Sequence, residues 1–330
     1  MSINQIFESF EKLKVLIIGD VMIDSYIIGK VERISPEAPI PIVNVKRKEK
    51  RLGGAGNVAM NIKALGAEAI LCAVVGKDSD GNDLIDLLKE SELSIDGIIQ
   101  SESRITTVKQ RIMAGSQHIV RIDSEMDELI NSTETAALLN CIDKLSEKVD
   151  VIVFEDYDKG VLSAELIQKT IDIAQKKGIP PIVDPKKRNF FNYQGADIFK
   201  PNLKELKEGL KIDISVEDLE NLQKVVEKAK NTLGVKGIFL TLSEKGVYLD
   251  FDSEKIIIPA HLRSITDVSG AGDTVVSIAA LCLALKLKPQ NIAAMANLGG
   301  GLVCEYVGVV PINKSKLQEE YEKLNKKALE

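Results

Sequence analysis

The sequence predicts an α/β fold in which helices cover both faces of a mostly parallel central sheet, with a small second sheet attached. Short apolar runs alternate with amphipathic stretches along most of the chain, as in proteins whose parallel strands are joined by helices. Two segments break this rhythm with alternating apolar and polar residues, which is typical of half-buried strands. The length of 330 residues suits one large domain with a small appendage.

The elements of the core follow from these patterns. The apolar runs predicted as buried strands are residues 15–18, 69–75, 151–154, 181–183 and 238–242. Residues 57–65 and 163–176 are predicted as helices, because their apolar side chains fall on one stripe at helical spacing. We expect both helices to cover the sheet.

The two interrupting segments predict the small sheet. Apolar and polar residues alternate from Ile42 to Lys46 and from Val108 to Ile112. We therefore expect a core of residues 1–25, 52–104 and 124–330, and a discontinuous β-sheet lid of residues 26–51 and 105–123. The lid is expected to close over a site and to form a homodimer interface.

Composition excludes several classes of protein. A formal net charge of −6 argues against broad nucleic-acid binding, which needs a surplus of basic residues. The four cysteines form no C-x-x-C pair, so neither a zinc site nor a disulfide framework is indicated: Cys72, Cys141, Cys282 and Cys304. Because no apolar run approaches the length of a membrane span or of a signal peptide, we expect a cytoplasmic protein without membrane contact.

The strongest local signal for chemistry is the loop from Asp267 to Asp273, which precedes a long apolar helix. Its Gly270-Ala271-Gly272 turn lets backbone amides converge at a helix N-terminus, an arrangement that suits a developing phosphate anion. Asp273 follows in the first turn, where it would be a general base for an attacking hydroxyl. A helix cap on a glycine-rich turn explains Asp273 equally well.

A second glycine-rich turn contains Gly53, Gly54, Gly56 and Asn57. It would allow close backbone approach to a polyhydroxyl ligand, although a strand-to-helix connection explains it as well. The turn lacks the Lys-Ser or Lys-Thr of a P-loop and the position of a dinucleotide-binding motif. The sequence therefore excludes both common nucleotide folds.

Taken together, the two turns resemble the paired signatures of the ribokinase-like (PfkB) carbohydrate kinases. The resemblance also covers Lys200 to Glu205, which is similar to the family's N-x-x-E motif, and Asp184-Pro185-Lys186 before it. It implies a ribokinase-like three-layer sandwich with a β-sheet lid and an ATP-dependent kinase with Mg²⁺ as cofactor. The match spans nearly the whole chain.

Further segments resemble the D-glycero-D-manno-heptose 7-phosphate kinases of that family. These segments are residues 19–26, 33–41, 156–160 and 267–275. Bifunctional members of the subfamily carry an H-x-G-H motif in a nucleotidyltransferase domain, whereas this sequence contains only His118 and His261. We expect the kinase half alone, with a separate nucleotidyltransferase acting later in the pathway.

The resemblance also implies roles for individual residues. Asp24, expected at the end of the first core strand, would bind the sugar together with Gly53, Gly54 and Asn57. Arg111 and Lys159 would contact the sugar's phosphate, although for basic residues of this kind exposure to solvent is the simpler explanation. The residues implied in ATP binding are Asn202, Thr241, Ser243, Gly246, Lys186 and Asn297.

Two metal roles are also implied. Glu205 and Asn202 would hold Mg²⁺ through water, and Asp267 would help to bind a monovalent cation such as K⁺. The expected reaction moves the γ-phosphoryl group of ATP to the C1 hydroxyl of the heptose 7-phosphate, in ADP-heptose synthesis for lipopolysaccharide. Two alternatives stay open: a ribose, fructose or 2-keto-3-deoxygluconate kinase of the same fold, or a non-catalytic sugar or nucleotide sensor.

Overall fold

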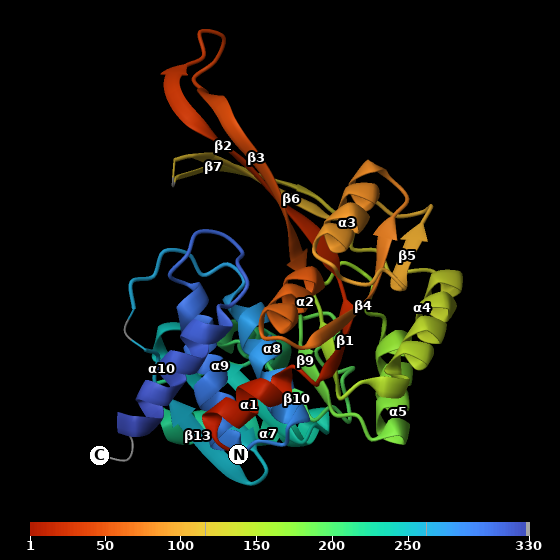
Figure 1. The fold of residues 1–330 in the computed structure, drawn as a ribbon, viewed down its shortest axis with the longest axis vertical. Helices are drawn as coiled ribbons and strands as arrows, with labels where there is room; N and C mark the ends of the chain where they lie inside the picture. The colour runs from red at the N-terminus through yellow and green to blue at the C-terminus, as the bar shows by residue number, and fades with distance from the viewer. Residues whose placement is uncertain (116, 262, 328–330) are drawn as a thin grey trace.

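The computed structural model describes residues 1–115, 117–261 and 263–327, and it confirms the predicted α/β class (Figure 1). The large sheet has the strand order β13-β12-β11-β10-β9-β8-β1-β4-β5 and is parallel from β11 to β5. β12 pairs in the antiparallel direction with both of its neighbours, β11 and β13. Its strands are β1 (Lys14–Gly19), β4 (Glu68–Gly76), β5 (Gly97–Ser101), β8 (Val151–Glu155), β9 (Pro181–Asp184), β10 (Ile198–Phe199), β11 (Gly237–Thr241), β12 (Val247–Phe251) and β13 (Glu254–Ile258).

Helices form a layer on each face of this sheet, which gives the predicted three-layer sandwich. Side chains of β1 alternate between two hydrophobic cores: Val15 and Ile17 face one, Leu16 and Ile18 the other. The first core includes residues of α1 (Ile3–Phe10), α2 (Ala55–Ala64), α3 (Ser79–Glu90), α8 (Ala271–Ala284), α9 (Pro289–Val303) and α10 (Lys314–Lys327). The second includes residues of α4 (Ser132–Leu145), α5 (Ala164–Lys177), α6 (Leu203–Leu210) and α7 (Leu219–Leu233).

Helix ends follow local chemistry. The hydroxyl of Ser163 accepts a hydrogen bond from the Leu166 amide at 3.1 Å, which begins α5, and Gly178 ends that helix with φ +69°.

Within the described ranges, none of the helices combines the length and apolar character that a membrane crossing requires.

A separate four-stranded sheet extends away from the core in Figure 1 and is called the lid sheet below. Its order is β3-β2-β6-β7, with β2 and β6 parallel and the other pairs antiparallel. The strands are β2 (Val21–Ile34), β3 (Pro41–Gly54), β6 (Val108–Ala114) and β7 (Gln117–Ser124). The sheet is therefore discontinuous in sequence. β2 begins five residues before the predicted segment 26–51, and β3 ends three residues after it.

The expectation that Asp24 ends the first core strand was wrong. β1 ends at Gly19, and after Asp20 the chain continues directly into β2, so that Asp24 lies within the lid sheet and pairs with Arg51 of β3. Gly19 and Asp20 stand between the predicted strand 15–18 and the apolar residues Val21 to Ile23, and a local pattern does not specify which sheet those apolar residues join.

The end of β1 packs tightly against β8. A Cβ atom at Gly19 would lie 1.9 Å from the backbone oxygen of Glu155, which is too close for any side chain. The glycine is therefore needed for the close approach of these two central strands.

We expect Gly19→Ala to lower the free energy of unfolding by about 2–3 kcal/mol, because the added methyl group must displace backbone rather than a flexible side chain. Urea unfolding followed by circular dichroism measures the change. Gly301→Ala is the control: its added Cβ meets only the Arg263 side chain, at 3.4 Å, and because alanine is the better helix former, we expect no loss of stability and a gain of up to about 1 kcal/mol. Equal effects of both substitutions would contradict this account.

Candidate active site

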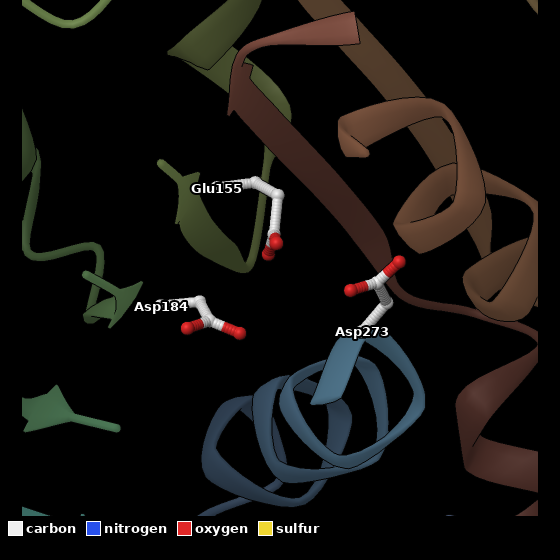
Figure 2. Close-up of side chains that lie close together, drawn as sticks. All are labelled: Glu155, Asp184 and Asp273. Atoms are coloured by element: carbon white, nitrogen blue, oxygen red, sulfur yellow. The ribbon is translucent and has the colours of Figure 1, made fainter. Parts of the chain in front are cut away.

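Carboxylates gather at the carboxyl edge of the central strands, facing the start of α8. In the parallel register, Gly19 lies beside Glu155, and Glu155 lies beside Asp184 on β9. Figure 2 shows the side chains of Glu155, Asp184 and Asp273 converging from β8, β9 and α8. One oxygen from each lies within 4.8 Å of the others. This edge is the candidate active site.

Asp273 lies in the first turn of α8 and is 5% exposed. Its two oxygens accept hydrogen bonds from the Asn57 amide nitrogen at 2.7 Å and from the Tyr157 hydroxyl at 2.8 Å. Burial raises the pKa of Asp273; these two donors oppose the rise, and the nearby Asp184 adds to it. The carboxylate is therefore fixed in orientation and made more basic than an exposed aspartate.

The N-terminus of α8 has the geometry expected of a tight turn. Gly270 has φ +79°, and a Cβ there would lie 2.8 Å from the Asn57 amide nitrogen, so the second glycine-rich turn packs directly on the first. The Ala271 amide donates to the Val268 carbonyl at 3.3 Å. Gly272 follows within the first turn, where a backbone amide has no acceptor within the helix. The predicted anion-binding turn is thus assembled next to Asp273.

Asp184 and Lys200 form a buried ion pair next to this turn. The Oδ2 atom of Asp184 lies 2.7 Å from the Nζ atom of Lys200, which is 3% exposed. A Cβ at Gly272 would lie 3.6 Å from Asp184 and 3.8 Å from Lys200, so both groups face the start of α8. Burial opposes the charge on Lys200, but the neighbouring carboxylates, Asp184 first, raise its pKa.

Glu155, Tyr157 and Lys200 were not among the predicted site residues. Glu155 is 0% exposed, and burial, then Asp184 and Asp273, raise its pKa well above the usual range. A signal was present, since two of the predicted strands, residues 151–154 and 181–183, are followed directly by an acidic residue, Glu155 and Asp184. In a parallel sheet such residues meet at one edge.

On the lid side, Asp24 forms an ion pair with Arg111 of β6, so the structure brings these two predicted residues together. Both side chains are largely buried. A Cβ at Gly53 would lie 2.3 Å from the Asp24 carboxylate, and Gly54 has φ +57°. Gly53 therefore makes room for Asp24 where the lid sheet meets the core, and Gly54 allows the close approach of the Asp20 backbone oxygen, which would lie 2.4 Å from a Cβ there.

The loop after β8 is anchored by Asp20. The Asp20 carboxylate accepts hydrogen bonds from the amides of Tyr157, Lys159 and Val161 at 2.9, 3.0 and 3.1 Å. Burial, followed by the nearby Asp156, raises the pKa of Asp20 to about 6 although these three donors oppose the rise. The Lys159 ammonium group extends toward the lid and contacts Glu125 at 2.8 Å.

The predicted nucleotide residues occupy adjacent strand ends. Asn202 forms a parallel bridge with Thr241, and it caps α6 in a reciprocal box with Glu205, in which both hydrogen bonds measure 2.8 Å. Lys186 lies 2.5 Å from Glu205 and 3.7 Å from Asp184. Lys186 therefore connects the predicted metal motif to the carboxylates below α8.

The remaining predicted residues lie on separate elements. Ser243, with φ +53°, and Gly246 form the turn between β11 and β12, and a Cβ at Gly246 would lie 2.0 Å from the Ile258 carbonyl oxygen. Asn297 is on α9, where its side chain donates to the Pro259 carbonyl at 2.9 Å.

Asp267 closes the loop that precedes α8. Its carboxylate accepts hydrogen bonds from the amides of Ser269 at 3.0 Å and Gly308 at 2.9 Å. Burial opposes ionisation, but these bonds outweigh it and lower the pKa of Asp267. A charged Asp267 thus holds the loop to the segment after α9.

Comparison with known proteins agrees with this geometry. The model of the pfkB family carbohydrate kinases matches residues 12–316. The chain is 39% identical over 318 residues to the bifunctional protein HldE of Sulfurimonas denitrificans, covering 96% of this chain and 66% of that protein. It is 37% identical over 295 residues to HldE of Helicobacter pylori, covering 89% and 63%. The chain thus spans a little under two thirds of the length of these relatives.

Solved structures share the fold at low identity. Phosphofructokinase-2 from Escherichia coli in complex with potassium superposes with a TM-score of 0.79 at 21% identity, covering 95% of this chain and 99% of that one. Ribokinase from Arabidopsis thaliana complexed with ribose and ATP superposes with a TM-score of 0.71 at 18% identity, covering 93% and 99%.

The family match covers most of the sequence, and the structure has the ribokinase-like sandwich with its separate sheet and two glycine-rich turns that meet at Asp273. The chain therefore belongs to the pfkB family of ATP-dependent carbohydrate kinases.

Proposed function

We propose that the chain transfers the γ-phosphoryl group of ATP to the C1 hydroxyl of D-glycero-D-manno-heptose 7-phosphate. The main support for kinase chemistry is the buried Asp273 carboxylate at the start of α8, oriented by Asn57 and Tyr157. The HldE relatives, at 39% and 37% identity, support a heptose as the sugar.

In this proposal Asp273 is the general base. It takes the proton of the C1 hydroxyl as that oxygen attacks phosphorus, and burial favours this transfer because it raises the basicity of the carboxylate. Backbone amides at Gly270, Ala271 and Gly272 lie at the N-terminus of α8, where partial positive charge stabilises the anionic phosphoryl group. Orientation and charge neutralisation supply most of the rate acceleration in such transfers.

Sugar binding is assigned to the junction of core and lid sheet. Asp24, Gly53, Gly54 and Asn57 line this junction and offer carboxylate, backbone and amide partners for hydroxyl groups. Arg111 and Lys159 carry the positive charge that a distal phosphate requires. Both are already paired, with Asp24 and Glu125, so substrate phosphate would compete with these carboxylates.

The nucleotide is assigned to Asn202, Thr241, Ser243, Gly246, Lys186 and Asn297. Kinases of this family use ATP with a divalent metal ion, and Glu205 supplies a carboxylate, the kind of ligand that Mg²⁺ prefers. Its two oxygens already contact the Lys186 ammonium group and the Asn202 amide, so we assign Glu205 and Asn202 to Mg²⁺ through bound water and not by direct coordination. Asp267 is the proposed residue for K⁺.

Two partners complete the proposal. The lid sheet is the proposed homodimer interface, and its outer residues include exposed apolar side chains such as Val45, Val120 and Ile122. A nucleotidyltransferase is the proposed partner that acts on the product, and the HldE relatives are named bifunctional proteins.

Asp273→Asn should lower kcat by on the order of 10³-fold while leaving the KM for ATP and sugar within a few-fold of wild type, because the amide cannot accept the hydroxyl proton. A coupled ADP-release assay measures both constants. Asp172→Asn, on the exposed face of α5, is the control and should retain full activity. Wild-type turnover by Asp273→Asn would remove this residue from the mechanism.

Tyr157→Phe should lower kcat about ten-fold and move the acidic limb of the kcat–pH profile to higher pH. The Tyr157 hydroxyl stabilises the ionised form of Asp273, so its removal raises the pKa of Asp273 and protonates the base at higher pH. Tyr321→Phe, which removes a hydrogen bond to Asn291 on α9, is the matched control. An unmoved profile in Tyr157→Phe would show that the hydroxyl does not act through the base.

A panel of acceptors tests the sugar. The heptose 7-phosphate should give the highest kcat/KM, above ribose, fructose and 2-keto-3-deoxygluconate, and Lys159→Ala should raise its KM about ten-fold or more through loss of a charge-assisted contact. A preference for a free pentose or hexose would contradict the heptose assignment and leave the kinase assignment in place.

A further inference from the structure

Where the lid sheet meets the loop after β8, one carboxylate lies between two lysines. The Oε2 atom of Glu125, just after β7, is 3.0 Å from the Nζ atom of Lys109 on β6. Its Oε1 atom is 2.8 Å from the Nζ atom of Lys159 in the core loop. The two lysine side chains are only 15% and 18% exposed. A cation of the lid sheet and a cation of the core therefore converge on one carboxylate.

This cluster adjoins the proposed sugar site. Lys109 pairs with Asp24 in the register of β6 and β2, so their side chains lie on the same face of the lid sheet. Lys159 lies two residues after Tyr157, whose hydroxyl contacts the proposed base Asp273. Both lysines therefore lie beside residues that act on the sugar in the proposed reaction, although the proposed mechanism assigns no role to Lys109.

The charges of this cluster leave one cation in surplus. Asp123, a second carboxylate, is 3.5 Å from Lys109 but 2.9 Å from the exposed Arg121, which neutralises it. Glu125 is then the counter-charge of both lysines. Burial opposes its ionisation, but hydrogen bonds from Lys159 and Lys109 outweigh burial and lower the pKa of Glu125, so the group is charged at neutral pH. A phosphate monoester, with a charge of about −1.5 to −2, would balance the two lysines, whereas one carboxylate does not.

Glu125 can leave the lysines at little cost. Its side chain is 30% exposed, and β7 ends at Ser124, so the residue lies outside the strand ladder and can turn to solvent. As part of the chain, it competes with a free anion at an effective concentration on the order of millimolar. A ligand carboxylate would only exchange one single charge for another, whereas a phosphate adds a second charge and more acceptor oxygens. Displacement is therefore favourable only for the dianion.

We propose that Lys109 and Lys159 form the subsite for the acceptor's phosphate group, and that Glu125 is a displaceable occupant that makes this subsite selective for a dianion. Without acceptor, Glu125 holds the two cations together against their mutual repulsion. When the acceptor binds, its phosphate takes both ammonium groups and Glu125 turns to solvent. The inference rests on the proposed phosphorylated acceptor, but it does not depend on which sugar carries the phosphate.

Inorganic phosphate tests the subsite without any sugar. The full chain is first saturated with Mg²⁺ and a non-hydrolysable ATP analogue, which fills the nucleotide site, and the thermal midpoint is then measured against phosphate or acetate at constant ionic strength. In wild type, phosphate should raise the midpoint and acetate should not. In Glu125→Gln, phosphate should act at an about ten-fold lower concentration, because its charged competitor is gone, and acetate should also raise the midpoint.

Two further variants locate the effect. Lys109→Ala should need about ten-fold more phosphate than wild type, or more, since one of two charge-assisted contacts is lost. Glu128→Gln is the matched control, because it removes the same charge from an exposed position three residues further along the segment. It should respond to both anions like wild type.

Three results would overturn the inference: a wild-type midpoint that phosphate does not raise, a wild-type phosphate response in Glu125→Gln, or the same response in Lys109→Ala. Passing these tests without turnover of the heptose 7-phosphate would support the subsite and reject the proposed sugar. Normal turnover of the heptose 7-phosphate, with a midpoint that phosphate does not change, would reject the subsite and support the proposed function.

Discussion

The hydrogen bond from Asn57 to Asp273 joins the two glycine-rich turns of the candidate active site. It connects the start of α2 to the start of α8 across a sequence separation of 216 residues, at a distance of 2.7 Å. Gly270 packs against the same Asn57 side-chain amide, so the two turns fit together only when position 270 carries no side chain. Tyr157 completes the arrangement from the loop after β8, and Asp20 holds that loop in place through three amides.

The same region ties the lid sheet to the core. The Tyr26 hydroxyl accepts from the Val309 amide at 3.3 Å, and Arg51 donates to the Val309 carbonyl at 3.0 Å. Gly308, the neighbouring residue, donates to Asp267. The base of the lid sheet and the loop before α8 therefore share one segment after α9. A movement of the lid sheet would therefore displace the contacts of Asp267, which lies six positions before the proposed base.

Electrostatics explains why this edge of the sheet is suited to chemistry. Burial and mutual repulsion raise the pKa of Glu155 and of Asp273, and buried Lys200 beside them stays charged because the carboxylates raise its pKa. Such groups are costly in a folded protein. Their concentration below the first turn of α8, opposite a partial positive charge, is the arrangement expected where phosphate is bound and moved.

The sequence by itself determined the α/β class, the strands that carry long apolar runs, and both glycine-rich turns, because hydrophobic period and backbone freedom are local properties. It also identified Asp273, whose position after Gly270 and Gly272 marks a helix start. Only the tertiary structure decided that Asp24 belongs to the lid sheet and pairs with Arg111, since strand continuity past Asp20 depends on which partner the backbone finds. Likewise, the meeting of Glu155, Asp184 and Lys200 depends on parallel register and burial, which bring together residues from separate strands and which no local pattern specifies.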